Sequence, residues 1–261
     1  MKKLGLALGA GASRGIAHIG FLKALEENGI KPDYIAGSSI GAVVGSFYSL
    51  GYSPDYMMRV ALALKARDIL DVSPTAIKNG TLLKSKKMAE LLNRYLGNKD
   101  IEDLPIPFKC VGIDIISGEK VVFDQGSVAV AVQASSSMPM VFAPVAYDNM
   151  LIADGGVVDR VPVDVVREMG AEVVVGVDVL GPVREIDELK SIFGYMLRVF
   201  DIYDSEVSAL NLKNNPPDIL CTPDLGNMSQ YKINPAQMEH AYNIGYESGL
   251  SIIDELKRKL A

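Results

Sequence analysis

Short apolar runs alternate with longer amphipathic segments along the first part of the chain. The runs Leu4–Leu8 and Tyr34–Gly37 have the length and composition of buried strands. Each is followed by a segment with helical spacing of apolar residues, Ser13–Asn28 and Ile40–Leu50, and both segments end at a glycine. Such alternation is typical of a parallel sheet with helices on both faces, so the pattern predicts an α/β fold.

The rest of the chain continues this alternation and adds two hairpins. Further helices are predicted over Met57–Ala66, Ser85–Leu96, Val128–Ser135, Val161–Met169, Ile186–Leu212 and Pro235–Lys259, with a looser stretch at Asp68–Gly80. The predicted hairpins and strands are Phe108–Ile115 with Lys120–Phe123, Val145 with Leu151–Ala153, Glu172–Val179 and Asp218–Thr222. Because no repeat or linker interrupts the pattern, we expect one domain over residues 1–261, with a core at 4–180 and a helix-rich part at 186–261.

Charge and cysteine usage exclude several classes of function. A net charge of −6 argues against nucleic acid, which calls for a basic face. Cys110 and Cys221 lack metal-ligand spacing, so we expect buried, reduced thiols. No apolar run is long enough to cross a bilayer, and the start of the chain imitates a signal peptide with too short an apolar part. We therefore expect a cytoplasmic protein.

The second predicted strand runs into a G-x-S-x-G sequence, in which Gly37 and Gly41 flank Ser39. Between a strand and a helix, this sequence places the serine on a sharp, strained turn with its hydroxyl exposed. The glycines are needed because a Cβ atom would clash where the backbone is crowded. We predict that Ser39 is a catalytic nucleophile.

A second glycine-rich turn, Gly9–Gly15, follows the first strand and opens the neighbouring helix. The backbone N–H groups of Gly11 and Ala12, with that of Ile40 after the nucleophile, are the predicted donors to a developing oxyanion. Arg14 either holds this loop through hydrogen bonds or attracts an anionic head group. It also stands where the dinucleotide pattern G-x-G-x-x-G needs its third glycine, which argues against a nucleotide site.

A serine nucleophile needs a base within hydrogen-bond reach, and three residues are candidates. Asp154 follows an apolar strand, and the glycines after it allow a tight turn that aims the carboxylate into a cleft. His240 fits the Ser–Asp–His order of α/β-hydrolases but lies in a helical stretch. His18 would compete with the oxyanion site for space. We predict a Ser39–Asp154 dyad, with supporting turns at Gly37, Gly41, Gly155 and Gly156.

The free pKa of an aspartate is about 4, which makes it a weak base for a serine. A dyad of this kind therefore depends strongly on its oxyanion donors, because losing one donor commonly costs about 3–4 kcal/mol.

Three motifs of this chain occur together: the glycine loop ending in Arg14-Gly15, the turn Gly37–Gly41 and the later Asp154–Gly156. In this combination the chain resembles the bacterial patatin-like phospholipases from about Leu4 to Val179. Supporting similarities are Ala17–Gly20, Ala134–Pro139 and Phe142–Pro144.

This resemblance implies a three-layer α/β/α sandwich with a central, mostly parallel sheet. It also implies a Ser39–Asp154 dyad that cleaves acyl esters of lipids without metal, calcium or another cofactor. Gly11 and Ala12 fall where the family's oxyanion donors lie.

The chain departs from the family pattern at two places. Ala10 and Ala12 stand where glycine is usual, so the loop either has negative φ there or stores strain. The pair Asp159-Arg160 replaces one that is often Asn-Asn, with no effect that the sequence reveals.

The leading functional hypothesis is a serine hydrolase acting on lysophospholipids, phospholipids or long-chain acyl esters. An acyltransferase using the same acyl-enzyme, and a catalytically weak lipid-binding regulator, remain alternatives. Peripheral membrane contact and a homodimer are both left open. Tyr56–Leu64 and Phe193–Phe200 are candidates for an acyl pocket or lid, although such apolar stripes are more typical of helix core.

Overall fold

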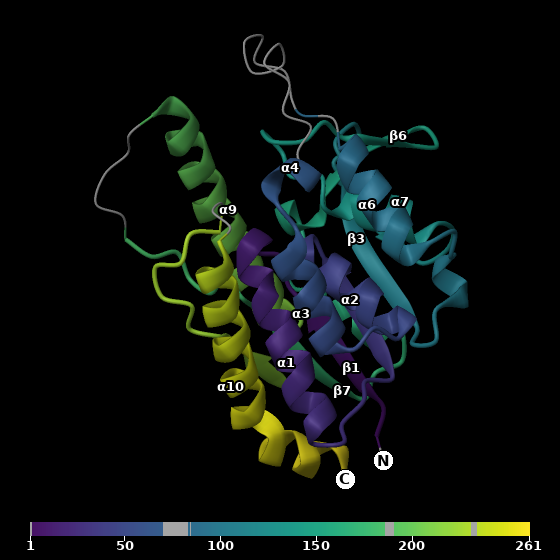
Figure 1. Ribbon diagram of the computed structural model, residues 1–261, viewed down its shortest axis with the longest axis vertical. Coiled ribbons are helices and arrows are strands. Elements are labelled where there is room, and N and C mark those ends of the chain that lie inside the picture. The colour runs from purple at the N-terminus through teal and green to yellow at the C-terminus, as the bar shows by residue number, and fades with distance from the viewer. Residues whose placement is uncertain (1, 70–82, 84, 186–190, 231–233) are drawn as a thin grey trace.

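The computed structural model describes residues 2–69, 83, 85–185, 191–230 and 234–261 (Figure 1). Their strands form one mixed sheet in the order β5-β6-β3-β2-β1-β7-β8, with β4 also paired to β3. The strands are β1 (Leu4–Leu8), β2 (Tyr34–Ser38), β3 (Phe108–Asp114), β4 (Lys120–Phe123), β5 (Val145–Tyr147), β6 (Met150–Asp154), β7 (Val173–Val177) and β8 (Ile219–Cys221). The pairings among β3, β2, β1, β7 and β8 are parallel, and those of β4, β5 and β6 are antiparallel.

The helices cover this sheet on both faces, as the alternating pattern predicts. They are α1 (Ile16–Glu27), α2 (Ile40–Leu50), α3 (Pro54–Ala63), α4 (Ala66–Ile69), α6 (Lys86–Leu96), α7 (Val128–Ser135), α8 (Val163–Glu168), α9 (Ile192–Asn214) and α10 (Pro235–Leu260). Short 3-10 turns are η1 (Ala12–Gly15), η2 (Ile101–Asp103) and η3 (Gly155–Val157). None of the described helices is both long enough and apolar enough to cross a membrane.

Several helix predictions differ from the structure in their bounds, among them those for α8, which begins at Val163, and α9, which ends at Asn214. The segment predicted as one helix from Ser13 is divided into η1 and α1. The helix predicted from Met57 begins earlier, because Ser53 accepts a hydrogen bond from the N–H of Tyr56 and Pro54 occupies the first turn. Most of the stretch Asp68–Gly80, and residues 186–190, lie outside the described residues.

Residue size along β1 determines how closely the helix layers approach the sheet. Leu4, Leu6 and Leu8 belong to the main core, which α1, α2 and α10 cover (Figure 1). Gly5 faces the other way, and a Cβ atom there would lie 2.6 Å from Cβ of Ala171 and 2.7 Å from the Val166 side chain. The small residues on this face therefore let α8 pack directly on the sheet, which completes a three-layer α/β/α fold.

Strand β3 brings the ends of two other strands together. Its residues Cys110–Ile113 pair with β4 along one edge. Its residues Phe108–Val111 pair with β2, and Gly112–Asp114 pair with β6. Because both of these ranges overlap the range that pairs with β4, β2 and β6 must share the opposite edge. The two strands run toward each other there, so their carboxyl ends meet beside the centre of β3.

Candidate active site

Ser39 lies on the turn between β2 and α2, in a backbone conformation that few non-glycine residues adopt. Its φ and ψ angles are 52° and −122°. A Cβ atom at Gly37 would lie 2.5 Å from the carbonyl oxygen of Gly41, and one at Gly41 would lie 2.0 Å from that of Leu8. The two glycines are therefore required by close backbone contacts, and they allow the sharp turn that presents the half-buried Ser39.

Asp154 is the residue that meets Ser39 at this turn. Ser39 Oγ donates a hydrogen bond of 2.5 Å to Asp154 Oδ2, and the N–H of Gly156 donates one of 2.8 Å to Asp154 Oδ1. Burial raises the pKa of Asp154 to about 7, although both hydrogen bonds act in the opposite direction. The carboxyl is thus a stronger base than the ordinary pKa of an aspartate suggests.

The glycine-rich loop is held at two points and leaves two N–H groups unused. The N–H of Gly9 donates to Val177 O at 2.9 Å, and that of Ala10 donates to Arg160 O at 3.0 Å. Within the described residues, the N–H groups of Gly11 and Ala12 have no acceptor. Ile40 begins α2, where the first N–H groups of a helix have no intrahelical acceptor. None of these three N–H groups has an acceptor among the described residues.

The backbone angles of Ala10 and Ala12 show which of these two alanines is strained. Ala12 has a φ of 45°, in the left-handed region that is costly for alanine, whereas Ala10 is outside that region. Strain is therefore confined to Ala12, one of the predicted oxyanion donors.

The remaining glycines of the predicted site permit close packing between its turns. A Cβ atom at Gly15 would lie 2.3 Å from the Ile40 side chain, and one at Gly155 would lie 2.2 Å from Val111 O. One at Gly156 would lie 3.0 Å from Cβ of Ala10. The glycine loop, the Ser39 turn and the Asp154 turn are thus in mutual contact.

Arg14 takes the first of the two roles considered for it. Its guanidinium donates to three carbonyl oxygens, those of Met228, Leu180 and Gly226, at 2.9, 3.2 and 3.0 Å. These bonds tie the glycine loop to two distant segments of the chain. The Arg14 guanidinium thus stabilises the position of the loop through hydrogen bonds.

The two histidines do not meet Ser39 through any hydrogen bond among the described residues. His18 is buried, and its Nε2 atom lies 2.8 Å from the carbonyl oxygen of Gly9. Burial lowers the pKa of His18 to about 4, so the ring is neutral at pH 7 and its Nε2–H donates to that carbonyl. His240 is exposed on α10.

Three consecutive serines at the end of α7, Ser135 to Ser137, form hydrogen bonds with the backbone of Ser39 and Asp154, and sequence reasoning assigned them no role. The N–H of Ser39 donates to Ser135 Oγ at 3.1 Å, and Ser136 Oγ donates to Ser39 O at 3.3 Å. The N–H of Asp154 donates to Ser137 O at 3.1 Å. The available signal was a run of hydroxyl side chains at a helix end, directly before the Met138-Pro139 breaker.

Arg160 also has a structural role that the sequence did not reveal. Its guanidinium is buried and contacts Asp178 at 2.8 Å and Asp204 of α9 at 3.0 Å. Asp178 in turn accepts hydrogen bonds from the N–H groups of Leu180 and Gly181. Because its carbonyl holds Ala10, Arg160 connects the glycine loop to α9.

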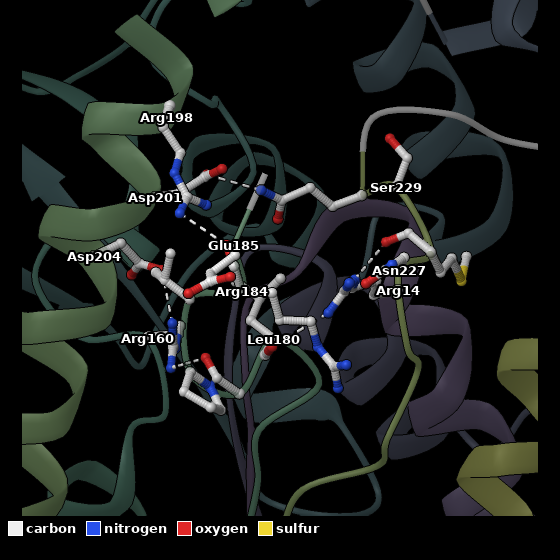
Figure 2. A pocket seen from close by; sticks show the side chains of 15 residues that line it. Arg14, Arg160, Leu180, Arg184, Glu185, Arg198, Asp201, Asp204, Asn227 and Ser229 are labelled. Carbon is white, nitrogen blue, oxygen red and sulfur yellow. Dashed lines mark hydrogen bonds and ion pairs between the residues drawn. The ribbon is translucent and has the colours of Figure 1, made fainter. Parts of the chain in front are cut away.

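A polar cavity of about 410 Å³ adjoins the glycine loop (Figure 2). Neither Ser39 nor Asp154 lines it. Its walls carry charged side chains from the glycine loop, from the chain before α8, from the chain after β7 and from α9, namely Arg14, Arg160, Arg184, Glu185, Arg198, Asp201 and Asp204.

Known proteins of similar sequence indicate the family of this chain. The family described as patatin-like phospholipase matches residues 6–167. An uncharacterized NTE family protein of Mycobacterium tuberculosis is 35% identical over 189 residues, covering 71% of this chain and 52% of the relative. Human patatin-like phospholipase domain-containing protein 6 is 32% identical over 186 residues, covering 67% of this chain and 13% of that protein. The chain thus spans about half the length of the mycobacterial relative.

Solved structures share the fold at low sequence identity. VipD from Legionella pneumophila superposes with a TM-score of 0.54 at 16% identity, covering 97% of this chain and 67% of VipD. The type III effector protein ExoU superposes with a TM-score of 0.51 at 14% identity, covering 100% of this chain and 54% of ExoU. With the family match spanning more than half of its length, the chain belongs to the patatin-like phospholipase family.

Proposed function

We propose that this chain is a serine acyl hydrolase that cleaves carboxylic esters of lipids, with Ser39 as nucleophile and Asp154 as its base. The observation that carries the proposal is the 2.5 Å hydrogen bond from Ser39 Oγ to the buried carboxylate of Asp154. Membership of the patatin-like phospholipase family supports a lipid ester as the substrate.

In the first half of the proposed reaction, Ser39 Oγ attacks the carbonyl carbon of the ester while Asp154 takes its proton. The oxyanion that forms accepts hydrogen bonds from the N–H groups of Gly11, Ala12 and Ile40. Collapse of this intermediate breaks the bond to the alcohol, which leaves with the proton from Asp154. The acyl group then remains as an ester on Ser39.

In the second half, water attacks the acyl carbon and gives its proton to Asp154. The second tetrahedral intermediate releases a carboxylic acid, and Asp154 returns the proton to Ser39 Oγ. The raised pKa of Asp154 suits proton transfer in both directions, because a group whose pKa is about 7 can both accept and return a proton at neutral pH.

Covalent labelling with a fluorophosphonate tests the nucleophile directly, because Ser39 Oγ would displace fluoride and keep the phosphorus. We expect one adduct per wild-type chain, located at Ser39 by peptide mass spectrometry, and none in Ser39→Ala. A wild-type protein that stays unlabelled and turns over no ester would sink the proposal.

A chain-length series of p-nitrophenyl esters tests the base and indicates which acyl length is preferred. We expect Asp154→Asn to lower kcat about 100-fold or more, and Ser39→Ala to remove turnover. His240→Ala should retain wild-type activity, because His240 is exposed on α10. If folded His240→Ala were as inactive as Ser39→Ala, the dyad assignment would be wrong.

A further inference from the structure

Helix α9 has its polar side turned toward the protein. Arg198, Asp201 and Asp204 all line the polar cavity from this helix (Figure 2). Further along the helix, Ser208 is buried, and Asn211 donates a 2.7 Å hydrogen bond to Val158 O. The side of α9 that packs on the protein is therefore polar and charged.

The outward side of the first half of α9, from Ile192 to Tyr203, is apolar. Ile192 is 77% exposed, and the six other large apolar or aromatic residues of this stripe are between 44% and 56% exposed. They are Phe193, Tyr195, Met196, Val199, Ile202 and Tyr203. A helix on the surface of a water-soluble domain has the opposite arrangement, with its apolar stripe toward the core. By sequence, Phe193–Phe200 is a candidate acyl pocket or lid, with helix core as the more typical alternative, and the exposure of Phe193, Met196 and Val199 rules out helix core for these residues. The described residues leave this stripe uncovered.

A second exposed apolar cluster lies on the hairpins beside the catalytic edge of the sheet. Ile115 and Ile116, directly after β3, are 51% and 67% exposed, and Leu151 of β6 is 36% exposed. The N–H of Ile115 donates to Leu151 O at 2.9 Å, so these side chains belong to one structural unit. The β5–β6 hairpin and the N-terminal end of α9 project at the same end of the molecule, toward which the parallel strands run (Figure 1).

The size and composition of the stripe favour a lipid surface over a second copy of the chain. A stable dimer uses about 20–30 residues from each partner, whereas the stripe offers seven in a single row. Tyr195 and Tyr203 have apolar rings with polar tips, which suit the boundary between water and lipid. A lipid surface also needs no shape complementarity, so it does not require the two clusters to form one continuous patch.

We infer that the apolar stripe of α9 and the Ile115–Ile116 cluster dock this protein on a lipid surface, next to the carboxyl edge of the sheet where Ser39 lies. The inference rests on the proposed function, because the surface would supply the ester substrate. The net charge of −6 gives no general attraction to anionic lipid. Binding is therefore driven by apolar burial, and a zwitterionic phosphatidylcholine bilayer is sufficient.

Co-sedimentation with phosphatidylcholine vesicles tests this inference, with Ser39→Ala as the background so that no lipid is consumed. We expect binding that persists in roughly 0.5 M salt, because salt at this concentration screens attraction between surface charges but does not weaken apolar burial. Adding Met196→Asp and Val199→Asp should weaken the partition at least about ten-fold, and Ile116→Asp should weaken it as well. Leu250→Asp is the matched control, since Leu250 is 41% exposed on α10, outside both clusters.

Two companion measurements separate the outcomes. In chains with Ser39 intact, these substitutions should leave turnover of a short, soluble p-nitrophenyl ester unchanged, which reports folding and catalysis independently of docking. Vesicle binding by Ser39→Ala that the α9 substitutions leave intact would overturn the inference, as would no binding at all. A dimer in sedimentation velocity that these substitutions convert to a monomer would instead make a second copy the occupant.

Discussion

Ser39 and Asp154, 115 positions apart in the chain, are brought together by two adjacent residues of β3. Ser38 pairs with Val111 at the end of β2, and Asp154 pairs with Gly112 at the end of β6. The hydroxyl and the carboxylate therefore share one rigid support. Strand pairing holds the backbone of Asp154 and of Ser38, the residue directly before Ser39, more firmly than a loop could, which favours a pre-organised site.

The pH dependence of turnover tests the state of Asp154. A base must be deprotonated to accept the Ser39 proton, and burial raises the pKa of Asp154 to about 7. We expect kcat/KM for a soluble p-nitrophenyl ester to rise with pH, with a midpoint near 7, and to level off above pH 8. Circular dichroism over the same range serves as the control for unfolding. A profile that is flat from pH 5 to 8 would contradict a base in this environment.

Ala12→Gly should stabilise the protein. Ala12 has a φ of 45°, which costs alanine about 1–2 kcal/mol, and glycine adopts it freely. The greater freedom of glycine in the unfolded chain offsets part of this gain, so we expect a net increase of about 0.5–1 kcal/mol in the free energy of unfolding. Urea denaturation measures it. Ala10→Gly, in the same loop but without positive φ, should destabilise instead, and equal effects of the two changes would refute localised strain.

Gly41→Ala should disrupt the site through backbone contact alone. The added methyl group would lie 2.0 Å from Leu8 O, an atom of the central strand that cannot move freely. We expect a loss of about 3 kcal/mol or more in urea denaturation, with loss of ester turnover. Gly29→Ala is the control, because the new methyl group there has nothing within 4 Å and only the positive φ of 71° opposes alanine. It should cost only about 1–2 kcal/mol and leave turnover intact.

Arg160→Met should destabilise the protein by about 3–5 kcal/mol at pH 8, because Asp178 and Asp204 would be left buried without their cation. Burial already raises the pKa of Asp204 to about 6 in the presence of Arg160. An acid with a raised folded-state pKa is penalised only while ionised, so the deficit should shrink as the pH falls from 8 to 5.

Urea denaturation of wild type and Arg160→Met at both pH values measures this change. Arg160→Lys is the matched variant, since lysine keeps the charge but cannot bridge two carboxylates as the planar guanidinium does. Arg160→Lys should lose less free energy of unfolding than Arg160→Met. A deficit for Arg160→Met that is independent of pH would indicate lost packing as the cause.

Local chemistry made most of the chain predictable. The strands at Leu4–Leu8 and Tyr34–Ser38 and the helix at Ile40–Leu50 follow from apolar runs, helical spacing and terminal glycines, which act over a few residues. Gly37 and Gly41 indicated a crowded turn because only glycine fits such backbone contacts. The family follows from motifs of the same local kind.

What the sequence could not determine depends on contacts between distant segments. The sharing of one β3 edge by β2 and β6, the pKa of Asp154 and the hydrogen bonds of Ser135, Ser136 and Ser137 with Ser39 and Asp154 arise only when distant segments pack together and burial removes water. The orientation of α9 is the clearest case, because its composition resembles a core helix while its polar side chains point toward the cavity (Figure 2). Periodicity reveals that a helix has two different sides, but only tertiary packing decides which side faces the protein.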